Sequence, residues 1–273
     1  MNDIVFSGST LIGYCITALI YLALPVAAFF IMRRYNSAKL LPITAGIITY
    51  FLSTRLADGM AYIMLPAASF AQKAAISTEI VCITEEFGRW LAIKYPLLNV
   101  RTSGAAVCYG IGHAGLECWI RGFDTFNIIG YGQKLNSEGV EPFTAGKTPQ
   151  AAEAVIKQLN AFADNDIFCS ILDWLNILTN FGFHICLSVM IFKKLNDNNF
   201  KKRWLLRAIL LHYLLNGSVW LTSFSGIAVL SKLTGIIVGA GIIVYVYRTI
   251  DGRSVIDDII YPSPEKQEEY YET

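Results

Sequence analysis

Several ionisable and amide side chains lie inside long apolar stretches of this 273-residue chain. An ionisable group in hydrocarbon costs about 3 kcal/mol on insertion scales, so a cluster of such groups usually marks a functional site. Glutamate and histidine in a buried cavity can activate water, transfer protons or bind a metal ion. The cluster contains all three histidines and comprises Glu85, Glu86, Arg89, His113, Glu117, His184, His212 and Asn216.

The spacing of these residues gives each stretch one polar helical face. Residues four apart share a face of a helix, and in a membrane bundle such a face must turn inward to find partners or water. Three stretches carry a pair with this spacing, and another carries a stripe of four. The pairs are Glu85 with Arg89, His113 with Glu117 and His212 with Asn216, and the stripe is Asp173, Asn176, Asn180 and His184.

The polar faces also reach a similar depth. At 1.5 Å per residue, Glu85, His184 and His212 each lie about 14 Å from the basic residue that ends their stretch, and His113 lies about 18 Å from its own. We therefore expect one shared site near the middle of the bilayer.

Simpler roles exist for single members of this set. A lone intramembrane histidine or asparagine is often only an interhelical hydrogen bond. Arg55 and Asp58 are three residues apart and are expected to form a structural ion pair. The six cysteines are scattered through the apolar stretches without CxxC spacing, so we interpret them as packing residues.

The composition predicts the class of protein. Hydrophobic residues make up 54% of the chain and charged residues 16%, which is typical of an integral membrane protein. A span needs roughly 20 mostly apolar residues. We predict an all-α, polytopic helical membrane bundle of about seven transmembrane helices, at residues 10–32, 41–65, 75–95, 102–121, 167–192, 204–223 and 226–248.

The fourth stretch has a further property, which is two rows of small residues. Small residues let neighbouring helix backbones approach closely, so His113 should lie at the centre of the bundle. The rows are Gly104, Cys108 and Gly112, and Ala106, Gly110 and Ala114.

The distribution of Lys and Arg predicts an orientation. Most of them follow the first, third, fifth and seventh stretches, which favours an outside N-terminus and a cytoplasmic tail in a bacterial cell membrane. The basic cluster at 193–203 is better explained as a topology signal than as a nucleic-acid surface, and we expect no nucleic-acid partner. The expected partners are the lipid bilayer and a membrane protein or peptide substrate.

We expect a single membrane domain over residues 1–260. It holds an outer-face insertion at about 127–166, whose first part is punctuated by glycine and proline. Within the insertion, Pro149 begins a short amphipathic helix with Val155, Leu159 and Phe162 on its apolar face. Residues 261–273 form a polar, acidic tail on the cytoplasmic side.

The order of the motifs resembles a known family. The chain carries EExxR at 85–89, GxGHxxxE at 110–117, a histidine in the next long span and HxxxN at 212–216. Together with the blocks TEEFGRWLAIK, YGIGHAGLE, HICLSV and LLHYLLN, this order resembles the YhfC-type bacterial intramembrane proteases, which are related to CAAX prenyl endopeptidases and PrsW-type proteases. The resemblance runs from the third span to the sixth. Two features differ from related patterns: CAAX enzymes have EExxxR, and Asn176 and Ile177 stand where YhfC-type members often carry a Glu–Arg pair.

The resemblance implies an intramembrane endopeptidase that uses a glutamate-activated water. It implies Glu85 as the base, supported by Glu86 and Arg89, and His113 as the group that orients the water or acts as a second acid or base. His212 and Asn216 would stabilise the oxyanion, and His184 and Glu117 would complete the site. The same residue types allow a zinc ion on His113, His184 and His212, with water as a further ligand.

Two other functions remain open. Intramembrane glutamate and histidine also serve proton-coupled transporters, although this chain shows no internal repeat and no proline inside its third to seventh spans. The replaced Glu–Arg pair also allows a non-catalytic immunity or binding protein of the same fold. No feature of the sequence indicates the substrate or the oligomeric state.

Overall fold

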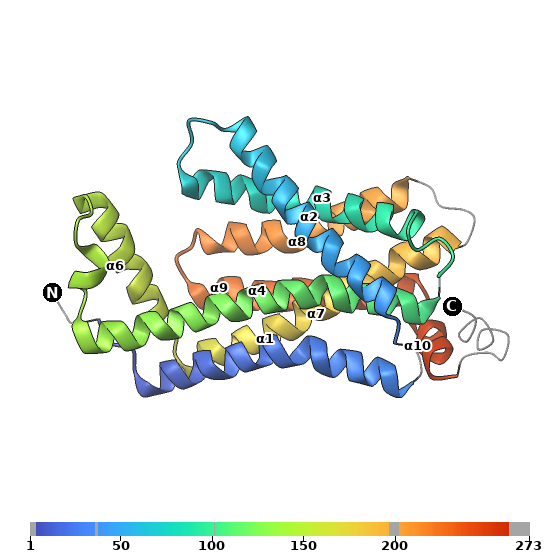
Figure 1. The fold of residues 1–273 in the computed structure, drawn as a ribbon, viewed down its shortest axis with the longest axis horizontal. Coiled ribbons are helices and arrows are strands. Elements are labelled where there is room, and N and C mark those ends of the chain that lie inside the picture. Colours follow the sequence, from blue (N-terminus) through green and yellow to red (C-terminus); the bar gives the residue numbers. More distant parts are fainter. Residues whose placement is uncertain (1–3, 36–37, 101, 197–201, 262–273) are drawn as a thin grey trace.

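The structure is a computed structural model that describes residues 4–35, 38–100, 102–196 and 202–261. All its regular elements over these residues are helices, which confirms the predicted fold class (Figure 1). Of the predicted tail 261–273, all but Tyr261 lies outside the described residues. The helices are α1 (Gly8–Arg34), α2 (Leu40–Met64), α3 (Phe70–Lys94), α4 (Ser103–Glu138), α5 (Glu141–Thr144), α6 (Pro149–Ala163), α7 (Ile167–Asn196), α8 (Arg203–Ser223), α9 (Ala228–Thr249) and α10 (Gly252–Ile260).

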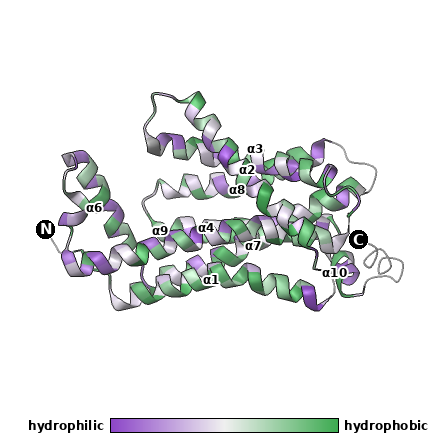
Figure 2. Ribbon diagram, viewed as in Figure 1, coloured by the Kyte–Doolittle hydropathy of each residue, from purple (hydrophilic) through white to green (hydrophobic). Residues whose placement is uncertain are grey.

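In the described part of the chain, five helices are long and apolar enough to cross a membrane: α1, α2, α7, α8 and α9. Helices α3 and α4 also have the length, at 25 and 36 residues. They carry the carboxylates and Arg89 of the candidate site, which lower their hydropathy, so the third and fourth predicted spans remain a prediction. Figure 2 shows hydrophobic residues over most of the bundle and more hydrophilic ones on α6 and the adjoining end of α4.

Helix α4 lies at the centre and packs against α1, α2 and α7. Its small residues permit this, as the sequence predicted. A Cβ atom on Gly112 would collide with the backbone of Ile43 in α2, and one on Gly110 would lie 2.6 Å from the Cα atom of Ile185 in α7. The contacts hold His113, next to Gly112, in the interior.

The insertion differs from its predicted form in its first part. Helix α4 does not end near residue 121 but continues to Glu138, where Gly139 stops it with a φ of 75°. The added turns pack against the described residues just before α1, and the ring of Phe6 lies on Gly132. Figure 1 shows α6 crossing beside this far end of α4.

Helix α6 agrees with the prediction for the second part of the insertion. Thr148 caps its first turn and Pro149 begins it. Leu159 is buried, with Val155 and Phe162 packed beside it, in a small apolar cluster that also includes Phe6. The insertion therefore covers one end of the bundle.

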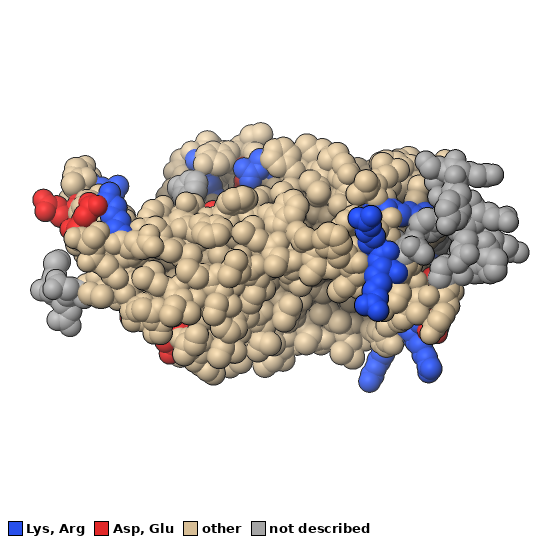
Figure 3. All heavy atoms as spheres, turned by 60° about the horizontal axis from the view of Figure 1, so that its bottom comes forward, with Lys and Arg blue, Asp and Glu red and all other residues tan. Residues whose placement is uncertain are grey.

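Basic side chains lie at the opposite end. The last turns of α1, α3, α7 and α9 contain Lys or Arg, and α8 begins with Arg203. Helix α10 closes this end through a hydrogen bond of 3.2 Å from Lys193 Nζ to Ser254 Oγ. Figure 3 shows the Lys and Arg side chains of this end beyond a broad surface with few charges.

Candidate functional site

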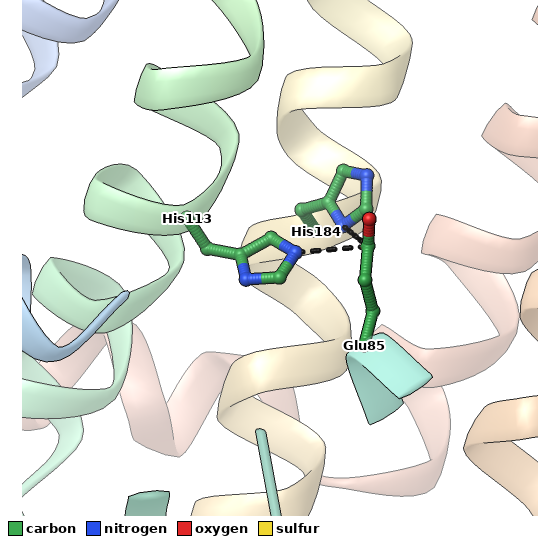
Figure 4. Close-up of side chains that lie close together, drawn as sticks. All are labelled: Glu85, His113 and His184. Carbon is green, nitrogen blue, oxygen red and sulfur yellow. Dashed lines mark hydrogen bonds and ion pairs between the residues drawn. The ribbon is translucent and has the colours of Figure 1, made fainter. Parts of the chain in front are cut away.

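Three of the predicted site residues, each from a different helix, meet in the interior: Glu85 of α3, His113 of α4 and His184 of α7 (Figure 4). Glu85 Oε2 lies 2.9 Å from His113 Nε2 and 4.0 Å from His184 Nδ1. All three side chains are buried. The ring centroids of the two histidines are 5.0 Å apart, so both rings can act on one small group beside Glu85.

Glu86 and Arg89 form a second unit with His212. The Arg89 Nε atom lies 3.1 Å from Glu86 Oε2, and His212 Nδ1 lies 3.0 Å from Glu86 Oε1. Arg89 also donates to the backbone oxygen of His184 at 2.8 Å and to the hydroxyl of Ser188. The i,i+4 spacing had suggested Glu85 as the partner of Arg89, but the guanidinium reaches the adjacent carboxylate instead.

Glu117 supports His184 from the other side. Its Oε2 atom lies 3.2 Å from His184 Nε2 and accepts a hydrogen bond of 3.0 Å from Asn180 Nδ2. Its Oε1 atom accepts one of 3.1 Å from Arg121 Nε. Arg121 was not among the residues that the sequence singled out, although it lies four residues after Glu117 and one turn further along the same face.

These contacts determine which ring nitrogen of His184 carries the proton. The carboxylate of Glu117 can only accept, so Nε2 is the nitrogen that donates to it. Arg89 Nη2 lies 3.2 Å from Nδ1 and can only donate, so Nδ1 presents a lone pair. That lone pair is on the side of Glu85.

The remaining predicted residues lie around this centre. Asn216 donates through Nδ2 to Cys82 Sγ at 3.4 Å. Asp173 pairs with Lys232 at 2.8 Å, in the half of α7 away from the basic end. Asn176 donates through Nδ2 to the backbone oxygen of Lys232 at 2.9 Å.

The predicted ion pair in α2 is also present. Arg55 Nη2 lies 3.2 Å from Asp58 Oδ2, and both side chains are partly exposed. The pair is therefore consistent with its expected structural role and lies outside the buried group.

The donor set fits a metal ion, with one change from the sequence prediction. One ligand atom each from Glu85, His113 and His184 lie within 4.8 Å of one another. Glu85 thus takes the place predicted for His212, whose Nδ1 is bonded to Glu86. Two carboxylates have arginine partners, whereas the partners of Glu85 among the described residues are histidines, so a cation would neutralise the charge of Glu85. A carboxylate behind a ligating histidine, as Glu117 is behind His184, is common around such ions.

A cavity of about 640 Å³ gives access to this group. Glu85, His184, His212 and Asn216 line its inner part. It continues past Arg121 to Arg55 and Asp58. In this outer part it is lined by the first half of α3, the second half of α8 and the first half of α9, all of which lie away from the basic end. Because water and an extended peptide segment fit into a volume of this size, the carboxylate of Glu85 can meet both.

Comparison with known proteins points to one family, both from a family model and from a single relative. The family model described as YhfC intramembrane metalloprotease matches residues 20–243. A relative from Bacillus subtilis (strain 168), described as uncharacterized membrane protein YhfC, is 24% identical over 204 residues, which cover 71% of this chain and 77% of the relative. No solved structure matches the chain.

Proposed function

This chain belongs to the YhfC intramembrane metalloprotease family, and on that premise we propose that it is an endopeptidase that hydrolyses a membrane-associated polypeptide in the cavity. The observation that carries the proposal is the buried group of Glu85, His113 and His184 at the inner part of a cavity able to hold a peptide segment. Transporters commonly carry internal repeats, and this chain shows none in its sequence.

In this mechanism Glu85 removes a proton from a water molecule as the water oxygen attacks the carbonyl carbon of the substrate. His113, 2.9 Å from Glu85, orients the carboxylate. The proton then passes from Glu85 to the leaving nitrogen as the C–N bond breaks. The products are a new carboxylate and an amine, so atoms and protons balance.

The negative oxygen formed during the attack needs hydrogen-bond donors. Asn216 and His212 line the same part of the cavity and are assigned this role. Among the described residues the amide of Asn216 donates only to a thiol, which is a weak acceptor, so the amide can turn to a stronger one. Glu86, bonded to His212 Nδ1, holds that ring in place.

A zinc ion held by Glu85, His113 and His184 would supply Lewis-acid activation of water and carbonyl at the same place. Glu117 would then orient His184, and Arg89 would keep its bonds to Glu86 and Ser188. Glu85 would act as a ligand in that case.

The test uses purified protein in lipid nanodiscs with a library of apolar, internally quenched fluorogenic peptides. We expect cleavage by the wild type and a loss of about 100-fold or more in Glu85→Gln, which keeps the size of the side chain but removes the base or ligand. Glu153→Gln, on the exposed side of α6, is the matched control and should cleave normally.

Two further arms separate the alternatives. Inhibition by a chelator and recovery with zinc would assign the metal mechanism, whereas indifference to chelator would assign the glutamic one. Equal cleavage by wild type and Glu85→Gln would rule out this site. Absence of cleavage across the library would favour a non-catalytic immunity or binding protein of the same fold.

A further inference from the structure

The wall of the cavity beyond the buried group carries three hydrogen-bond donors from three helices. Arg121 of α4, Tyr21 of α1 and Tyr50 of α2 all line the cavity. Tyr21 packs on Gly122, next to Arg121, and the Tyr50 ring lies edge-on to His113 with centroids 5.3 Å apart. The three donors therefore form one patch, next to the reacting centre.

Most of the donor capacity of this patch is unused. Arg121 bonds through Nε to Glu117, and no other hydrogen bond or ion pair of its side chain occurs within the described residues. The hydroxyls of Tyr21 and Tyr50 likewise make no hydrogen bond to the described part of the chain. Glu117 fixes the guanidinium while its two Nη groups stay available, and 60% of the Arg121 side chain is exposed.

A second arginine of the same cavity serves as a comparison. Arg55 is paired with Asp58, whose other oxygen accepts a hydrogen bond of 2.6 Å from Ser77. Asp58 therefore already uses the charge of Arg55, whereas the carboxylate beside Arg121 is shared with His184 and Asn180. The charge of Arg121 is offset by Glu117, and what Arg121 leaves for a ligand is its two Nη groups, which make no hydrogen bond within the described residues.

We propose that Arg121, Tyr21 and Tyr50 form a subsite for a carboxylate of the substrate. A guanidinium with two free Nη groups binds a carboxylate through paired hydrogen bonds, and each phenol can donate one more. The subsite would select polypeptides with an acidic side chain or a C-terminal carboxylate on the side of the scissile bond that faces away from the basic end. This inference rests on the proposed proteolytic function, because it names the substrate class of the same site.

The test measures binding, so that it does not depend on cleavage. Protein with Glu85→Gln, in phosphatidylcholine nanodiscs, is titrated with dodecanoyl-leucyl-glutamate amide and with the glutamine counterpart, which differs only in the charge. A third ligand, dodecyl phosphate, represents a lipid headgroup. Thermal unfolding of every variant checks that it is folded.

We expect the glutamate ligand to bind about tenfold or more tightly than the glutamine ligand, as for a hydrogen-bonded charge pair. Arg121→Gln should remove that preference, and Arg55→Gln should keep it. Tyr21→Phe and Tyr50→Phe remove one hydroxyl each without touching Glu117, so they should each lower the preference several-fold even if Arg121→Gln fails to fold.

Equal binding of the two peptides by folded protein would overturn the subsite. Tighter binding of dodecyl phosphate than of the glutamate ligand would reassign the patch to lipid headgroups and equally overturn it. Preferential binding of the glutamate ligand without cleavage of any peptide would leave the subsite standing and reject the proposed protease activity.

Discussion

At the scale of single residues, three carboxylates enter the centre of the bundle, and their partners decide what each can do. Glu86 is held by Arg89 and Glu117 by Arg121. Glu85 has only histidine partners among the described residues. A carboxylate paired with arginine is a poor base, since its charge is already stabilised. Glu85 is therefore the carboxylate left for water or a metal ion.

The first residue-scale prediction concerns Arg89, which is fully buried. Arg89→Ala should reduce the yield of folded protein, because it leaves the Glu86 carboxylate buried without its cation at a cost of about 3 kcal/mol or more. Glu85→Gln should fold like the wild type. Size-exclusion profiles and thermal unfolding in detergent measure both, and a normal profile for Arg89→Ala would contradict the assigned pairing.

A second prediction concerns metal content. Protein purified after growth with zinc should carry about one ion if Glu85, His113 and His184 form the site. Glu85→Gln and His113→Gln should each lose most of it, while His212→Gln should keep it, because His212 is bonded to Glu86. Elemental analysis by mass spectrometry gives the ratio. Loss of zinc in His212→Gln and His113→Gln, with zinc retained in Glu85→Gln, would instead support the three-histidine set that the sequence suggested.

The sequence could predict these residues but not their partners. Helical spacing places Glu85, Glu86 and Arg89 within one turn, and both i,i+3 and i,i+4 pairs are then possible. The rotation of α3 about its own axis decides which of the two pairs forms. That rotation is set by packing between α3 and α8, which residue spacing along one helix cannot reveal. The same limit explains why Arg121 was not found, since its role depends on the cavity beside it.

At the scale of elements, α4 brings the site together because its small residues admit α2 and α7. Gly112→Ala should lower the folded yield strongly, since the added methyl group meets the backbone of Ile43, which cannot move aside as a side chain can. Gly241→Ala in α9 is the control, because nothing lies within 4 Å of its added methyl group. Thermal unfolding compares them, and equal stability would show that the α2–α4 contact tolerates separation.

The length of α4 shows where local sequence rules fail. Gly130 and Gly132 favoured an irregular insertion, yet both lie inside the helix. The Phe6 ring occupies the space that a side chain at residue 132 would need, so that glycine serves packing. A contact between residues more than 100 positions apart in the sequence thus overrides the low helix propensity of glycine. By contrast, α6 was predictable because its cap, its proline and its apolar face are all local.

At the scale of the whole molecule, the two ends of the bundle differ in charge and in covering. One end carries the basic turns and α10, and the other carries α5, α6 and the extension of α4. The cavity extends toward the second end. The side on which substrate enters therefore depends on the orientation of the chain in the membrane.

The final prediction is that the N-terminus and α6 lie outside and that α10 lies in the cytoplasm, because basic turns remain on the cytoplasmic side. In a variant with its six cysteines replaced by serine or alanine, Lys147→Cys and Arg253→Cys provide one exposed thiol at each end. A membrane-impermeant maleimide should label Lys147→Cys in intact spheroplasts and Arg253→Cys only after lysis. The reverse pattern would place the cavity entrance on the cytoplasmic side. The carboxylate that Arg121 is proposed to bind would then belong to a cytoplasmic segment of the substrate, so this experiment also determines which polypeptides can reach Glu85.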